Sequence, residues 1–112
     1  MSYQRLTKAT ALLGGANIGG GSDILKVSST SAAINPGSIA ATSRGTATGT
    51  ITGAAAGDFV VAEFQASLND DLVFEGAKIT GANTVTIYLY NPTGGAIDDG
   101  SLTWKFLWFD LT

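Results

Sequence analysis

The strongest constraint on the fold is a series of short runs rich in β-branched and aromatic residues, each bounded by Gly, Asn, Asp or Pro. The runs cover residues 24–30, 44–52, 58–64, 72–80, 83–91 and 101–112. Runs of this length and composition predict strands separated by turns. Segments with a helical period are absent from the sequence. Strands that recur about every ten residues predict an all-β sandwich.

The first 22 residues differ from the rest of the chain. Their apolar side chains are scattered without a helical or alternating period, and they end in a cluster of glycines at positions 19–21. Adjacent glycines lose much backbone entropy when they become ordered, so they favour a flexible joint. We therefore predict an extended N-terminal arm over residues 1–22 and a β-domain over residues 23–112.

Residues 44–52 alternate between Thr and small residues. Thr46, Thr48, Thr50 and Thr52 lie on the hydroxyl face of an extended strand, and the opposite, small apolar face carries Gly45, Ala47, Gly49 and Ile51. Such a face permits close approach of a neighbouring segment.

The chain has few groups that support catalysis, because it contains neither His nor Cys. Its adjacent carboxylates, Asp70-Asp71 and Asp98-Asp99, lie in turn-like sequence, where Asp usually accepts hydrogen bonds from local backbone N–H groups. A glycosidase pair in a polysaccharide hydrolase and a calcium site are the alternatives. We expect no catalytic residues, no metal site and no cofactor.

Charge and hydropathy exclude two further classes of partner. The net charge is −3, and the six Lys and Arg are scattered singly, so we expect no nucleic-acid binding. No stretch reaches the roughly 18 consecutive apolar residues of a membrane helix, so we expect no membrane partner.

The last run of the chain is apolar on both faces when it is extended. Trp104, Phe106 and Trp108 share one face, and the other carries three large apolar side chains. These three are Leu107, Phe109 and Leu111. Burial of such side chains stabilises by roughly 1.5–3 kcal/mol each, so about 5–9 kcal/mol depends on covering the second face. The run therefore predicts an oligomer, and we assign all six residues to the oligomer interface. Coverage by the N-terminal arm is the alternative.

Two tyrosines and two tryptophans suggest a second kind of binding site. Tyr88, Tyr90, Trp104 and Trp108 could form a platform on which sugar rings stack, because aromatic faces pack against apolar sugar faces. Packing in the core and at the interface is the favoured interpretation, because these aromatics lie within long apolar strands.

Several features of the second half occur in a fixed order. They are the Gly57-Asp58 step, the strand at 72–74, the strand at 83–87, Asn91 before a Gly-containing loop, and residues 95–98 leading to Trp104. In this order they resemble a module of tailed-bacteriophage virion proteins, found in capsid decoration proteins and at the ends of tail fibres. The resemblance implies an antiparallel jelly-roll β-sandwich, commonly trimeric, with a structural or binding role. The apolar ending departs from the family's shorter and more polar last strand.

The expected function is that of a capsid decoration, or cement, protein on the outer capsid surface of a virion. It would form a homotrimer and bridge subunits of the major capsid protein, with Tyr3, Leu6, Leu12 and Leu13 of the arm as anchors on the shell. The alternative is a tail-fibre or receptor-binding module that recognises a host surface glycan.

Overall fold

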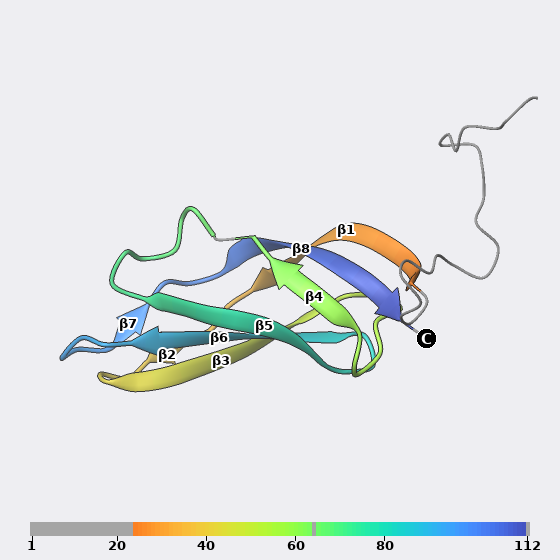
Figure 1. Cartoon of the computed structure of the whole chain (residues 1–112). Helices are drawn as coiled ribbons and strands as arrows, with labels where there is room; N and C mark the ends of the chain where they lie inside the picture. The colour runs from red at the N-terminus through yellow and green to blue at the C-terminus, as the bar shows by residue number, and fades with distance from the viewer. Residues whose placement is uncertain (1–23, 64, 112) are drawn as a thin grey trace, which may run out of the picture.

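The computed structural model describes residues 24–63 and 65–111, and its regular secondary structure consists of antiparallel β-strands (Figure 1). The strands are β1 (Ile24–Ile34), β2 (Ser38–Ile39), β3 (Ser43–Thr50), β4 (Phe59–Ala62), β5 (Val73–Gly81), β6 (Thr84–Asn91), β7 (Ile97–Asp98) and β8 (Leu102–Leu111). The predicted all-β class is confirmed. The predicted arm lies outside the described residues.

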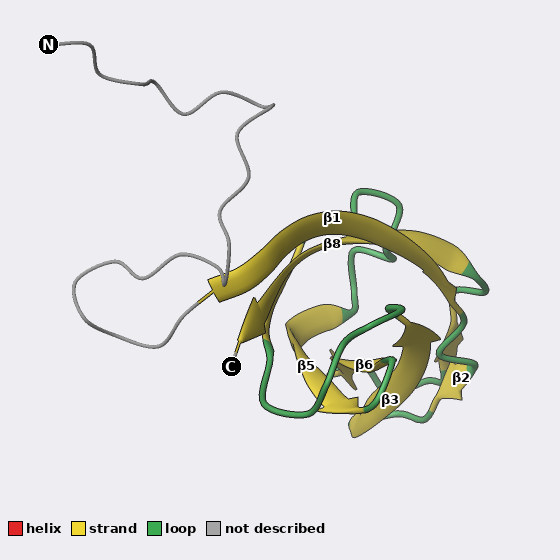
Figure 2. Ribbon diagram, turned by 90° about the vertical axis from the view of Figure 1, so that its right-hand side faces the viewer, coloured by secondary structure: helices red, strands yellow, loops and turns green. Residues whose placement is uncertain are grey.

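Two three-stranded sheets form the body of the molecule, in the orders β1-β8-β4 and β3-β6-β5, and β2 and β7 form a small third sheet. The pairings are nested along the sequence, since β1 pairs with β8, β2 with β7 and β3 with β6. Viewed from the side of Figure 2, β1 and β8 curve over β3, β5 and β6, and the strands surround one interior. The arrangement is compatible with a β-sandwich.

The interior is filled by alternate residues of the central strands. From β8 come Trp104, Phe106 and Trp108, which are only 1–2% exposed. From β6 come Val85, Ile87 and Leu89, which are completely buried. Alternation along the sequence separates the two faces of each strand, and the structure shows that these faces point inward. Both central strands place bulky side chains inward because each is covered on that side by the opposite sheet.

The small face of β3 lets the two sheets approach closely. A Cβ added to Gly49 would lie 2.8 Å from Cγ1 of Ile34 and 3.0 Å from Cβ of Ala32, both on β1. A Cβ added to Gly45 would lie 2.6 Å from Cγ1 of Ile39. The threonines between these glycines are exposed. At Gly49, β1 makes the close approach that this face permits.

A buried asparagine fixes the turns at one end of the molecule. The side chain of Asn91 is fully buried, and its Nδ2 donates to the carbonyl oxygens of Ile39 at 2.9 Å and Gly95 at 2.8 Å. Its Oδ1 accepts from the backbone N–H of Thr93 at 2.9 Å and the Thr93 hydroxyl at 2.7 Å. One side chain thus connects strand β2 to the loop after β6.

Candidate interaction surface

The outward face of sheet β1-β8-β4 carries large apolar side chains in register. Phe109 of β8 lies between Val27 of β1 and Phe59 of β4, and Leu107 lies in the next row opposite Val61. Exposed fractions are 54% for Val27, 56% for Phe59, 49% for Val61 and 42% for Leu107. The rings of Phe59 and Phe109 meet edge to face, with centroids 5.5 Å apart. We call Val27, Phe59, Val61, Leu107 and Phe109 the apolar face.

The apolar face ends in a polar row. Lys105 lies two residues before Leu107 on the same side of β8, and its Nζ lies 3.7 Å from Oε2 of Glu63, which directly follows β4. Between the apolar and polar rows lies a shallow depression of about 200 Å³, whose lining includes Ser29, Val61 and Leu107. The surface therefore has an apolar centre and a charged border, which is the usual composition of a protein interface.

Asp58 connects the start of β4 to the end of β8. Its carboxylate accepts from Nε1 of Trp108 and from the backbone N–H of Leu111, each at 3.1 Å, and from the N–H of Ala55 at 2.9 Å. Partial burial raises the pKa of Asp58, but the donors of Ala55, Leu111 and Trp108 lower it more, so the pKa lies below its ordinary value of 3.8. The ionised carboxylate holds together the two strands that carry most of the apolar face.

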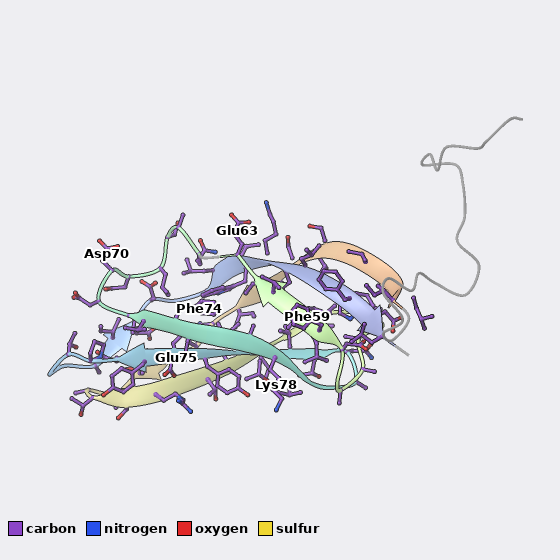
Figure 3. All side chains as sticks on the ribbon, in the orientation of Figure 1. Phe59, Glu63, Asp70, Phe74, Glu75 and Lys78 are labelled. Atoms are coloured by element: carbon purple, nitrogen blue, oxygen red, sulfur yellow. The ribbon has the colours of Figure 1, made fainter. Side chains whose placement is uncertain are left out.

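The outward face of the opposite sheet, β3-β6-β5, has a different chemistry. Tyr88 and Tyr90 of β6 are half-buried there, between the exposed Thr46 and Arg44 of β3 and residues of β5. Lys78 of β5 and Glu63 project on opposite sides of the molecule (Figure 3). The two sheets thus present an apolar surface on one side and a hydroxyl-rich surface on the other.

The six residues assigned to the oligomer interface fall into two groups. Trp104, Phe106 and Trp108 are buried within the chain itself, so they belong to its core and are removed from the interface. Leu107 is exposed, and Phe109 and Leu111 are partly exposed. These last three stay candidates.

The aromatic sugar platform does not form as one surface. Its two tryptophans lie inside the molecule, whereas Tyr88 and Tyr90 face outward from the other sheet. The four arm residues, Tyr3, Leu6, Leu12 and Leu13, lie outside the described residues.

Sequence reasoning missed Val27, Phe59 and Val61 as parts of the apolar face. Their own runs show the signal, because residues 58–64 and 24–30 place these side chains at alternate positions. What the sequence does not give is the register that places β1 and β4 on either side of β8.

The two pairs of adjacent carboxylates have different surroundings. Asp70 and Asp71 lie in the turn before β5. Oδ1 of Asp98, at the end of β7, accepts from the N–H of Gly100 at 3.1 Å, whereas Oδ2 of Asp99 accepts from the N–H of Asn69 at 2.8 Å. Asp98 therefore bonds the local backbone, and Asp99 connects the loop after β7 to the loop before β5. Within residues 24–63 and 65–111, no three acidic side chains lie close enough together to hold a metal ion.

Comparison of the chain with protein-family models, curated proteins and solved structures gave no match. In the described part of the chain, no helix is long and apolar enough to cross a membrane.

Proposed function

We propose that this chain is a structural virion protein that decorates the outer surface of a bacteriophage capsid and acts by binding alone. The observation that carries the proposal is the apolar face, which leaves Val27, Phe59, Val61 and Leu107 about half exposed on one sheet. Large contiguous exposed apolar patches often mark interaction sites. The resemblance of residues 51–62 and 72–104 to phage decoration modules supports the choice of partner.

The first partner of the apolar face is a further copy of the chain. Covering a half-exposed apolar side chain stabilises by about 0.7–1.5 kcal/mol, so the five residues of the face supply roughly 4–7 kcal/mol per copy. A standard interface buries about 800 Å² per partner, and the polar row of Lys105 and Glu63 would form its rim. We propose a closed oligomer, because closed symmetry covers each face without leaving an open end, and specifically a homotrimer, because the phage modules that the chain resembles are commonly trimeric.

The trimer would act on the shell through multivalency. Several weak contacts between one trimer and neighbouring subunits of the major capsid protein sum to tight binding. The N-terminal residues 1–22, with Tyr3, Leu6, Leu12 and Leu13, are proposed to make part of that contact. We also propose that the fold is of jelly-roll type, a proposal supported by the nested pairing of β1 with β8, β2 with β7 and β3 with β6.

Sedimentation velocity at micromolar protein concentration tests self-association. Val61 and Val73 make a matched pair, since they are 49% and 48% exposed on the outward faces of the two different sheets. We expect the wild-type chain and Val73→Lys to sediment as trimers and Val61→Lys to sediment as a monomer. A monomeric wild-type chain, or equal behaviour of the two variants, would contradict the proposed interface.

Electron microscopy of virions tests the role on the capsid. Virions that contain this protein should carry regular protrusions on the shell, and virions produced without its gene should lack them. Deletion of residues 1–21 should abolish binding to undecorated particles and leave the trimer intact. Full binding by the truncated chain would refute the role of the N-terminal residues, and identical particles in both preparations would refute the decoration function.

A further inference from the structure

The outward face of sheet β3-β6-β5 has a pair of tyrosines on its central strand. Tyr88 and Tyr90 are two residues apart on β6, so their side chains leave the same face about 7 Å from each other. Both are half-buried. Arg44 of β3 lies beside Tyr90, and Thr46 lies beside Tyr88. The rings are therefore flanked on one side by polar groups.

On the other side, a β-bulge places a glycine opposite the first ring. The pairing of β5 with β6 shifts between Phe74 and Gly76, so Glu75 is an extra residue and Gly76 comes opposite Tyr88. Gly76 has a φ of +145°, and outside its two chain neighbours no heavy atom lies within 4 Å of the position that a Cβ would take. The side chain that this part of β5 contributes beside the tyrosines is therefore that of Glu75. Bulges of this kind are frequent at sheet edges and next to active sites.

The residue added by the bulge forms an ion pair across the central strand. Nε of Arg44 lies 2.7 Å from Oε1 of Glu75, and Nη2 lies 3.4 Å from Oε2. Because β6 lies between β3 and β5, this pair crosses the strand that carries both tyrosines. The pair neutralises both charges, and the guanidinium retains further N–H donors. The Arg44 side chain is 60% exposed, so these donors are accessible.

Hydroxyl groups extend the polar surface beyond the tyrosines. Thr48 is exposed, and the hydroxyls of Thr80 and Thr86 lie 2.8 Å apart in a hydrogen bond. The face thus combines two aromatic rings, a row of hydroxyls, an internally neutralised ion pair and one further cation, Lys78, opposite Thr86. These groups match a ligand that has apolar C–H faces and many hydroxyls.

We propose that this face is a binding site for a neutral carbohydrate, with sugar rings stacked on Tyr88 and Tyr90 and sugar hydroxyls bonded to Arg44 and Glu75. A highly anionic polymer is disfavoured because Glu75 neutralises Arg44, and Lys78 is the one other cation among the described residues of this face. The site lies on the sheet opposite the apolar face, so the proposal does not depend on self-association.

Affinity electrophoresis of the full chain in native gels tests the site. The gels contain mannan, dextran or hydroxyethylcellulose, with heparin as the charged comparison. We expect at least one neutral polysaccharide to retard the wild-type chain, and we expect Tyr88→Ala and Tyr90→Ala each to weaken the apparent affinity at least tenfold. Tyr88→Phe, which keeps the ring, should retain most of the binding.

Two further variants control for folding and for exposed apolar surface. Arg44→Ala changes a largely exposed side chain and should weaken retardation severalfold without unfolding the chain, even where a tyrosine variant fails to fold. Leu25→Ala removes an exposed apolar side chain from the opposite sheet, outside the apolar face, and should bind like the wild type. The proposal is overturned if no neutral polysaccharide retards the chain, if only heparin does, or if the alanine variants at Tyr88, Tyr90 and Arg44 match the wild type.

Discussion

Substitution of Gly49 by Ala should destabilise the fold, although alanine is normally the better residue in a strand. The added Cβ would lie 2.8 Å and 2.9 Å from Cγ1 and Cδ1 of Ile34, and 3.0 Å from Cβ of Ala32. Ile34 is 1% exposed and packed between the sheets, so it cannot swing into solvent. Overpacking of this kind lowers the free energy of unfolding by about 1–3 kcal/mol. Alanine also reduces the backbone entropy of the unfolded chain, and this effect stabilises the folded state by about 0.4–1 kcal/mol and offsets part of the loss.

Gly81→Ala is the matched control. Gly81 also lies in a strand, and nothing lies within 4 Å of the position that its Cβ would take. The free energy of unfolding of Gly49→Ala should therefore be about 1–3 kcal/mol below that of Gly81→Ala, which corresponds to a difference in Tm of roughly 5–20 °C. Urea unfolding followed by tryptophan fluorescence measures it, because Trp104 and Trp108 move from the core into water.

A second substitution tests the cause of the destabilisation. Ile34→Val removes Cδ1, which is one of the three atoms nearest the added Cβ. Alone it should cost about 0.5–1.5 kcal/mol. Combined with Gly49→Ala, it should cost less than the sum of the two changes, since one clash is gone. Equal stability of Gly49→Ala and Gly81→Ala at the same protein concentration would refute the close approach of β3 to β1.

Two further substitutions address buried polar contacts. Asp58→Asn should lower the free energy of unfolding at pH 7 by about 1–3 kcal/mol, because the carboxylate accepts charge-assisted bonds from Trp108 and Leu111. Since the folded pKa of Asp58 is lowered, this contribution is present above about pH 4 and is lost as the pH falls through the folded pKa, so urea titrations of variant and wild type should converge at low pH. A gap that stays constant from pH 7 to pH 2 would contradict this reasoning, and Asp70→Asn, at an exposed turn position, controls for loss of charge. Asn91→Ala should cost at least about 2 kcal/mol, because it leaves buried backbone groups without partners, and a Tm within 2 °C of the wild type would refute that role.

The described strands are largely predictable because local alternation encodes them. Val85, Ile87 and Leu89 on one face of β6, and the small residues on one face of β3, follow from a period of two. The turn at Asn35 to Ser38 also follows from its residues, and Gly37 adopts the positive φ of 71° that such a turn favours. The separation of the β8 side chains into two faces has the same local origin.

The candidate surfaces are less predictable because they depend on register. Val27 and Phe59 are separated by a long stretch of sequence, yet they lie on either side of Phe109. Their aromatic character suggests a common site for Tyr88, Tyr90, Trp104 and Trp108. The structure places the two tyrosines on one sheet and the two tryptophans on the other. The bulge that brings Glu75 to Arg44 gives no sequence signal beyond a single glycine.

The sequence by itself determined that the chain forms strands, which residues of each strand share a face, and that the last strand is apolar on both sides. Only the tertiary structure decided which faces became core and which became surface. The physical reason is that alternation along a strand is local, whereas burial depends on which strands lie beside it and which sheet covers it. Trp108 and Leu107 are neighbours in the chain, but the opposite sheet covers Trp108, whereas Leu107 points away from that sheet and is 42% exposed.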